Sequence, residues 1–307
     1  MKRGRRSPVI VSPPTRENSF ASLLVGDIMR RSMLVRRESA SLYAAIALLI
    51  KHKADALLVV DRDNLPVGVV TKTEVMGAYF GELPVETTLG EIMGGPVIAC
   101  RPEDTLQDAL VIMQEHSIHR IYVLDPDSGR VIGALSYPDI VGILYRYCCR
   151  CEMSLHRCRR LSDREDDRRL TAAEAMHRSL ITASCSATVE QIIELLACYR
   201  IGALLLVDDQ NRPAGVLSKT DLALAYRRAV PLQEKAAVIM QRSLRCCRET
   251  DRLESAIRQM IFAEVSRLFV TDASSPAIVG VVTLTDAARM RSGSCRACTN
   301  SRIIPKG

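Results

Sequence analysis

The stretch LLLVDDQNRPAGVLSKTD, residues 204–221, joins an apolar run, a polar turn and a second apolar run that ends in Ser, Lys, Thr and Asp. The same pattern occurs three more times. The other copies are ALLVVDRDNLPVGVVTKTE (56–74), IYVLDPDSGRVIGALSYPD (121–139) and LFVTDASSPAIVGVVTLTD (268–286). An internal repeat outranks other sequence signals, because each copy must form the same kind of structural unit. The chain is therefore predicted to contain four repeats.

A helix is predicted upstream of each stretch. Apolar residues recur there at positions i, i+3, i+4 and i+7, the spacing of one helix face. The four sets are Leu42, Ala45, Ile46, Leu49; Leu106, Ala109, Leu110, Met113; Val189, Ile192, Ile193, Leu196; and Leu253, Ala256, Ile257, Met260. A polar residue before each set is predicted to cap the helix, namely Ser39, Asp104, Ser186 and Asp251. Further upstream each repeat has a lead segment ending in Met: 27–29 (DIM), 91–93 (EIM), 174–176 (EAM) and 238–240 (VIM).

Each quoted stretch is predicted to form two strands joined by a turn, followed by a helix that begins at its Ser or Thr. The predicted fold class is α/β (α+β), with four β-α-β-β-α repeats. The second-strand glycines Gly68 and Gly133 are 65 residues apart, as are Gly215 and Gly280, whereas Gly133 and Gly215 are 82 apart. The repeats are therefore predicted to pair as 1 with 2 and 3 with 4.

The predicted boundaries follow from this spacing. The four repeats occupy 21–85, 86–147, 171–230 and 231–291. A linker rich in Cys and Arg, 148–170, separates the two pairs, and a C-terminal tail covers 292–307. Residues 1–20 are basic and contain Pro, which predicts a flexible tail.

Composition narrows the class of protein. A chain of 307 residues that is 48% hydrophobic can bury a large core, and its net charge of +7 favours anionic partners. Only 4% of the residues are aromatic, so base stacking is poorly supplied and nucleic-acid binding is not favoured. No apolar run approaches the ~18 residues of a membrane span. The eleven cysteines are unevenly spread over the repeats, which favours reduced thiols and a cytoplasmic location over a disulfide framework.

The lead segment, the helix register and the Gly-x-x-[Ser/Thr]-x-x-Asp ending together resemble the cystathionine-beta-synthase (CBS) domain over residues 21–147 and 171–291. This resemblance implies two Bateman modules, each made of two paired repeats with clefts that bind AMP, ADP, ATP or S-adenosylmethionine. Four repeats without a catalytic domain are most similar to the gamma subunits of AMP-activated protein kinase and to stand-alone prokaryotic CBS proteins. The resemblance implies regulation of a partner protein, which the sequence does not identify, and homodimerisation through the module faces.

The carboxylate three residues after the Ser or Thr is the most informative position. One carboxylate can accept hydrogen bonds from both hydroxyls of a ribose, and the resemblance assigns it that role. The hydroxyls preceding it can bond ribose or phosphate oxygens at a helix N-terminus. The alternative is a plain capping box, which needs no ligand. The candidate pairs are Thr71 and Glu74, Ser136 and Asp139, Ser218 and Asp221, and Thr283 and Asp286.

Phosphate groups require cations, and the repeats differ in supplying them. His119 and Arg120 in repeat 2 and Arg267 in repeat 4 precede strands, where the resemblance places phosphate contacts. Repeats 1 and 3 have Asp55 and Gly202 there, and Lys72 and Lys219 compensate in part. Because repeat 1 combines Asp55 with Glu74, its site is predicted to be the one left empty. The alternative for each cation is a solvated or paired surface residue.

Two other functions remain open. An S-adenosylmethionine module is disfavoured because Arg120 and Arg267 would repel a sulfonium cation. A metal- or redox-responsive scaffold would use the cysteines of the linker and Cys295 and Cys298, whose spacing does not match paired zinc knuckles. No Walker loop, GxSxG or HExxH motif occurs, so the chain is predicted to have no catalytic activity, catalytic residues or metal ligands of its own.

Overall fold

The computed structural model describes residues 9–10, 23–142 and 170–287. The first repeat contains α1 (Val25–Ile28), β2 (Val35–Arg37), α2 (Leu42–Lys51), β3 (Ala56–Val60), β4 (Pro66–Thr71) and α3 (Lys72–Phe80). The second contains α4 (Leu89–Ile92), β5 (Ile98–Cys100), α5 (Leu106–Glu115), β6 (Arg120–Leu124) and β7 (Val131–Ser136). The third contains α8 (Ala172–Ala175), β8 (Thr182–Ser184), α9 (Val189–Cys198), β9 (Ala203–Val207), β10 (Pro213–Ser218) and α10 (Lys219–Arg227). The fourth contains the 3-10 helix η1 (Ala236–Val238), β11 (Cys246–Arg248), α11 (Leu253–Phe262), β12 (Arg267–Thr271) and β13 (Ile278–Thr283).

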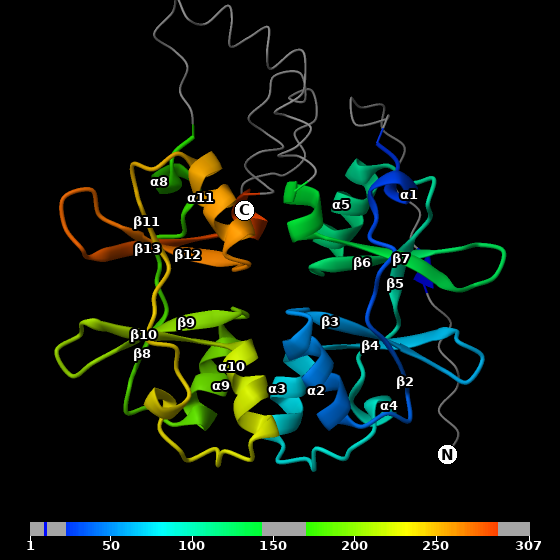
Figure 1. The fold of residues 1–307 in the computed structure, drawn as a ribbon, viewed down its shortest axis with the longest axis horizontal. Coiled ribbons are helices and arrows are strands. Elements are labelled where there is room, and N and C mark those ends of the chain that lie inside the picture. The colour runs from blue at the N-terminus through cyan, green and yellow to red at the C-terminus, as the bar shows by residue number, and fades with distance from the viewer. Residues whose placement is uncertain (1–8, 11–22, 143–169, 288–307) are drawn as a thin grey trace, which may run out of the picture.

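The predicted order of elements is confirmed. Repeats 1 and 3 show the complete order, and in repeats 2 and 4 helical residues 137–142 and 284–287 follow the last strand up to the end of the described ranges. In each repeat, the first strand pairs in parallel with the second, and the second pairs antiparallel with the third. The residues that set the helical period are all buried, because this face of each helix packs onto the core. The four sheets surround the centre of the molecule in Figure 1, one in each quarter of the view.

Two details differ from the sequence expectations. Val9 and Ile10, within the predicted flexible tail, form β1, which pairs in parallel with the edge of β5. The helix caps lie one or two residues beyond those predicted: Ser41, Thr105, Thr188 and Arg252 occupy the cap positions. The predicted cap Asp104 instead accepts a hydrogen bond from the Arg101 amide, 2.7 Å away, and so closes the turn before the helix.

The repeats pair by exchanging their lead segments. The amide of Val25 donates to the carbonyl of Asp104, and that of Arg30 to the carbonyl of Ala134, each at 2.8 Å, so the first lead segment lies on repeat 2. Repeat 2 returns the exchange through a bridge between Gly94 and Val69. The third and fourth repeats are joined by equivalent bridges: Thr171 to Arg252, His177 to Val281, Thr188 to Lys235 and Val216 to Gln241. The predicted pairing into two Bateman modules is confirmed.

The two modules meet through their helices within one chain. One apolar core joins α2 and α3 of repeat 1 to α9 and α10 of repeat 3, and a second joins α5 of repeat 2 to α11 of repeat 4. At the first contact the rings of Tyr79 and Tyr226 stack with centroids 4.9 Å apart, and the Tyr79 hydroxyl donates to the Val230 carbonyl at 2.5 Å. A homodimer, which stays a prediction, would have to use surfaces other than these helix faces.

No helix in the described ranges is both long enough and apolar enough to cross a bilayer. The cysteines described by the structure are free thiols. Within those ranges no group of three or more His, Cys, Asp or Glu could hold a metal ion. The predicted linker cysteines, and Cys295 with Cys298, lie outside the described residues.

Alkaline pH should destabilise the fold through its buried thiols. Burial, with a smaller effect of Asp104, raises the pKa of Cys100 from 9.0 to about 12, and burial raises that of Cys247 to about 11. The unfolded chain ionises these thiols near pH 9 while the folded chain keeps them neutral. Their contribution to stability is therefore fully present below pH 9 and is lost as the pH rises toward 11 and 12. Each thiol should lower the free energy of unfolding by about 1.4 kcal/mol per pH unit in that window.

Urea unfolding at a series of pH values from 8 to 10.5 measures this loss. The matched control is Cys100→Ala, which should unfold with a shallower dependence on pH because one ionising thiol has been removed. Equal slopes for the two proteins would contradict the assignment of the effect to Cys100.

Candidate functional site

Each predicted carboxylate caps the helix that follows the second strand. The inner oxygen of Asp221, Oδ2, accepts from the amide and the hydroxyl of Ser218, at 2.8 and 2.6 Å. Asp286 Oδ2 accepts in the same way from Thr283, at 3.0 and 2.6 Å. The remaining two pairs, Ser136 with Asp139 and Thr71 with Glu74, form the same contacts. The capping role is therefore present in all four repeats, and any ligand role must come in addition to it.

The second carboxylate oxygen, which the cap does not use, is called the outer oxygen below. In three of the four repeats it contacts a side chain of the paired repeat. Gln241 Nε2 donates to Asp221 Oδ1 at 2.8 Å. His177 Nε2 lies 2.9 Å from Asp286 Oδ1, and Arg30 Nε forms an ion pair with Asp139 Oδ1. These three residues immediately follow the Met of a lead segment. The sequence prediction missed them, although a polar residue after that Met was the available signal.

Repeat 1 differs because Gly94 occupies the equivalent position in repeat 2. A Cβ added to Gly94 would lie 3.5 Å from Glu74 Oε1, so this glycine is beside the outer oxygen but offers no side chain. Within the part of the chain that the structure describes, no side chain donates to Oε1. Glu74 is thus the one carboxylate of the four whose outer oxygen faces a glycine.

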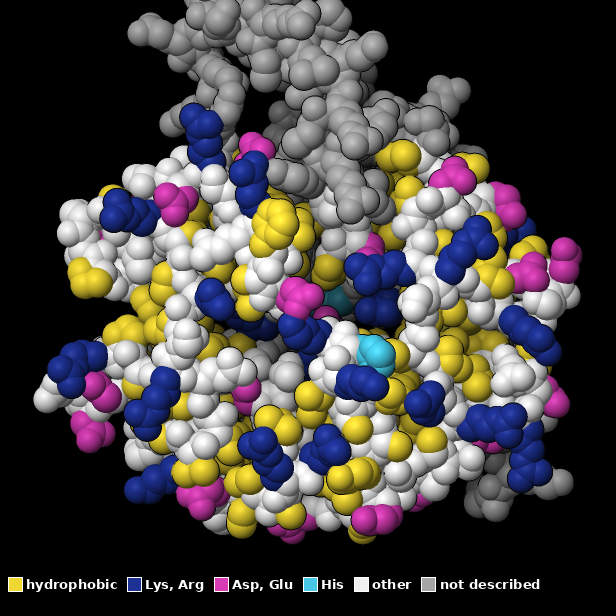
Figure 2. Space-filling view, viewed as in Figure 1, with side chains coloured by type: hydrophobic (Ala, Val, Ile, Leu, Met, Phe, Trp, Pro, Cys, Tyr) yellow, Lys and Arg dark blue, Asp and Glu magenta, His cyan; other side chains and the backbone are white. Residues whose placement is uncertain are grey.

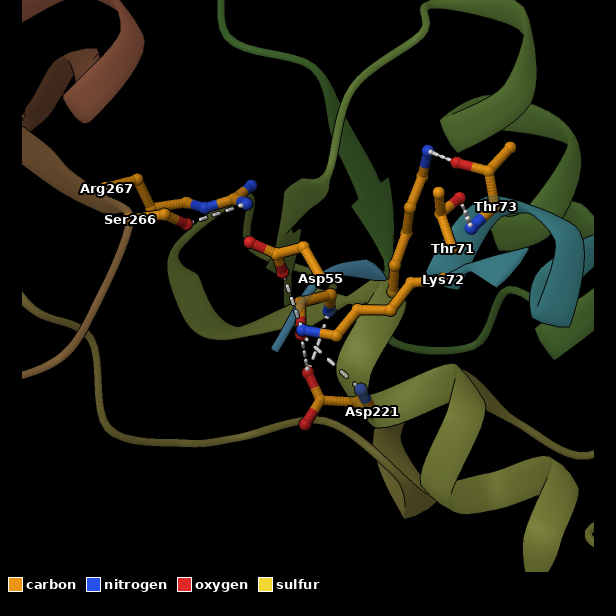
Figure 3. Close-up of polar contacts among 9 residues, drawn as sticks. Asp55, Thr71, Lys72, Thr73, Asp221, Ser266 and Arg267 are labelled. Atoms are coloured by element: carbon orange, nitrogen blue, oxygen red, sulfur yellow. Dashed lines mark hydrogen bonds and ion pairs between the residues drawn. The ribbon is translucent and has the colours of Figure 1, made fainter. Parts of the chain in front are cut away.

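The side chain of Arg267, in repeat 4, extends to Gly202 in repeat 3. A Cβ added to Gly202 would lie only 2.9 Å from Arg267 Nη2, so the glycine makes room for the guanidinium. Burial lowers the pKa of Arg267, while Asp55 and Asp221 favour its charged form. Figure 3 shows the guanidinium directed toward Asp55, with Asp221 on the neighbouring helix. The structure therefore brings together a predicted phosphate contact and a predicted ribose contact from two paired repeats.

Two lysines approach the same region. Lys219 Nζ donates to Thr73 Oγ1 of the other module at 3.0 Å, and burial lowers the pKa of Lys219 while Glu74 opposes that shift. Lys72 Nζ forms an ion pair with Asp55 at 2.8 Å. Asp55 therefore neutralises the lysine that was expected to compensate for it. Figure 2 shows Lys and Arg side chains gathered around the centre of the molecule, where the repeats meet.

The predicted cations of repeat 2 lie at the start of β6: Arg120 is its first residue and His119 precedes it. Arg120 pairs with Ser136 across β6 and β7, as Arg267 pairs with Thr283 across β12 and β13. The ring of His119 packs edge-on against Tyr137, with centroids 5.6 Å apart. A surface hollow of about 440 Å³ lies elsewhere, on β8 and α9, and none of the predicted site residues lines it. The charged groups described above converge at the contacts between paired repeats, which are called joints below. The candidate site is therefore at the joints and not in this hollow.

Paired α/β repeats that exchange lead segments and place a capped carboxylate at each joint define a class of tandem-repeat proteins. The model of the CBS domain family matches residues 25–81, 89–146, 172–228 and 236–293. This chain belongs to the CBS domain family.

Some relatives match more than half of this chain. Protein MJ1225 of Methanocaldococcus jannaschii is 22% identical over 198 residues, covering 64% of this chain and 68% of that protein. Its crystal structure, of a protein proposed to be an archaeal homologue of the gamma subunit of AMP-activated protein kinase, superposes with a TM-score of 0.71 at 15% identity, covering 87% of this chain and 99% of that one. The gamma-3 subunit of AMP-activated protein kinase from Sus scrofa is 22% identical over 199 residues, 62% of this chain and 37% of the subunit.

Some relatives are enzymes that are matched only in part. The homoserine O-acetyltransferase of Methanocorpusculum labreanum is 31% identical over 114 residues, which is 37% of this chain but only 23% of the enzyme. The chain thus spans less than a quarter of that enzyme's length. Structural likeness below 25% identity shows the fold, and function must be argued from the site.

Proposed function

We propose that this protein is a non-catalytic regulatory module, located in the cytoplasm, that binds AMP, ADP or ATP at the joints between paired CBS repeats. Nucleotide occupancy would report the energy state of the cell to a partner protein. The sequence likeness to the gamma-3 subunit of AMP-activated protein kinase supports this class of function. The fold by itself does not specify the ligand, so the proposal depends on the side chains at the joints.

One observation carries the proposal: Asp221 of repeat 3 and Arg267 of repeat 4 lie in the same joint. Asp221 offers an acceptor for ribose hydroxyls at the start of α10, and the guanidinium of Arg267 suits phosphate oxygens. Lys219 adds a second cation at the same helix N-terminus, which itself favours anions. Asp55 also lies beside the guanidinium, but its charge is offset by its ion pair with Lys72. The remaining acceptor and two cations suit a nucleotide that has a diol at one end and a phosphate at the other.

The charges also separate the two adenosine ligands. A nucleotide phosphate is attracted by Arg267 and Lys219, whereas the sulfonium of S-adenosylmethionine is repelled by both. Lys219 also contacts Thr73 across the boundary between modules. A phosphate that drew Lys219 away from Thr73 would change a contact between modules, which gives a physical route from ligand binding to the arrangement of the modules.

Adenine nucleotides should stabilise the chain, and the stabilisation should depend on the cap carboxylates. At a ligand concentration 100 times the dissociation constant, binding adds about 2.7 kcal/mol to the free energy of unfolding. Asp221→Ala and Asp286→Ala should each weaken binding by roughly 10- to 150-fold, because a hydrogen-bonding charge is lost. Glu74→Ala is the comparison variant and should change binding little, since the lysine of the same repeat, Lys72, is paired with Asp55 and is not available to a phosphate.

Thermal melting with AMP, ADP, ATP, GTP and S-adenosylmethionine, followed by calorimetric titration, measures both effects. Because the carboxylates also cap helices, the ligand-free melting temperature of each variant is measured first. Protein verified to be free of nucleotide whose melting temperature is unmoved by millimolar adenine nucleotides would refute the proposed function.

A further inference from the structure

The residues that contact the outer carboxylate oxygens occupy the same position in their repeats but have different functional groups. An amide (Gln241), an imidazole (His177) and a guanidinium (Arg30) each follow the Met of a lead segment and each reach the outer oxygen of the paired repeat's carboxylate. We call these three residues the latch residues. The three groups differ chemically, but each of them occupies the outer oxygen of a carboxylate.

The inner oxygen is not available for a ligand. In Asp221 and Asp286 it accepts an amide and a hydroxyl at 2.6 to 3.0 Å, and these two donors belong to the helix cap. Both carboxylates are buried, with 6% and 8% of their surface exposed, so an approaching group has little choice of direction. The hydroxyls of a ribose must therefore bond the outer oxygen, which is the atom that the latch residue holds.

We propose that the latch residues set the nucleotide affinity of each joint by competing with the ribose for the outer carboxylate oxygen. This inference rests on the proposed function and adds the residues that determine affinity. His177 and Arg30 have side chains that are 64% and 73% exposed, so each can swing into water when a ligand takes its place. Gly94 shows that a lead segment forms its bridge to the paired repeat without a latch.

Removing a latch should therefore strengthen nucleotide binding. Gln241→Ala is expected to raise the affinity of the full chain for AMP by about 10-fold, the equivalent of one hydrogen bond to a charged group. His177→Ala tests the same effect independently at Asp286. In 2′,3′-dideoxy-AMP the competing hydroxyls are absent, so Gln241→Ala should leave its affinity unchanged. A Gly94→Gln variant is the matched control, because it alters the equivalent position in the other module and should leave binding at Asp221 unaffected.

Calorimetric titration with AMP and 2′,3′-dideoxy-AMP gives the affinities, and the gain should vanish when Gln241→Ala is combined with Asp221→Ala. Gln241 is exposed, so the variant is expected to fold, and ligand-free melting verifies this. If the unaltered chain binds AMP but both latch variants bind it equally or more weakly, the latch residues are structural or ligand contacts and the inference is wrong. If neither the unaltered chain nor the variants bind AMP, the proposed function fails and the inference fails with it.

Discussion

Replacing Tyr226 by Ala should lower the free energy of unfolding by about 3 to 5 kcal/mol, the usual cost of removing a buried aromatic side chain. Tyr226 is 6% exposed, stacks on Tyr79 of the other module and donates through its hydroxyl to the Leu83 carbonyl. The substitution removes the stacking, the hydrogen bond and the apolar contact between α3 and α10 together. Urea unfolding measures the change.

Two further variants separate the contributions. Tyr226→Phe keeps the ring and removes only the hydroxyl, so it should cost about 0.5 to 1.5 kcal/mol. Tyr199→Ala is the control, because that ring is 53% exposed and its loss should change stability by less than about 0.5 kcal/mol. A Tyr226→Ala protein as stable as Tyr199→Ala would show that the two modules do not pack through α3 and α10.

Gly215→Val should also destabilise the chain strongly, with an expected loss of about 3 kcal/mol, the upper end of the usual cost of overpacking. A Cβ at Gly215 would lie 2.7 Å from the carbonyl oxygen of Gln241 and 2.8 Å from Met240 Sδ. The methionine can move, but the carbonyl belongs to the bridge that joins the lead segment to β10. The valine must therefore push the lead segment of repeat 4 away from repeat 3.

The control is another glycine of the same chain. Gly77 lies within α3, and a Cβ added there meets nothing within 4 Å. Gly77→Ala should therefore stabilise the helix by roughly 0.5 to 1 kcal/mol, since alanine is the better helix former. Melting temperatures of the two variants should move in opposite directions. A destabilised Gly77→Ala, or a Gly215→Val that melts with the unaltered chain, would contradict this account of the glycines.

The elements of the fold could be predicted because they depend on local patterns repeated four times. Apolar residues recur with a helical period in 42–49 and in the equivalent helices of the other repeats, and these residues are buried. The caps were placed one or two residues too early because several polar residues precede each helix, and only geometry separates a turn-closing Asp104 from a capping Thr105. Strand β1 was missed because two residues are too few for a pattern.

The site was only partly predictable, for a different physical reason. The Ser218 and Asp221 cap is local, three residues apart, and can be found from sequence. The contact of Gln241 with Asp221 spans 20 residues, and that of His177 with Asp286 spans 109. Both depend on the exchange of lead segments, which no local pattern reveals. The position of Arg267 beside Gly202 depends on the pairing of whole repeats in the same way.

The exchange of lead segments also has a consequence for the order in which the chain matures on the ribosome. Residues 25–30 bond backbone groups of Pro102, Asp104 and Ala134, so the first repeat cannot be completed until translation has passed residue 134. The segment at His177 similarly waits for Val281. Each module should therefore close as one event late in its own synthesis. Because domains generally fold in the order of their synthesis, the second module should close against helices α2 and α3 that have already folded.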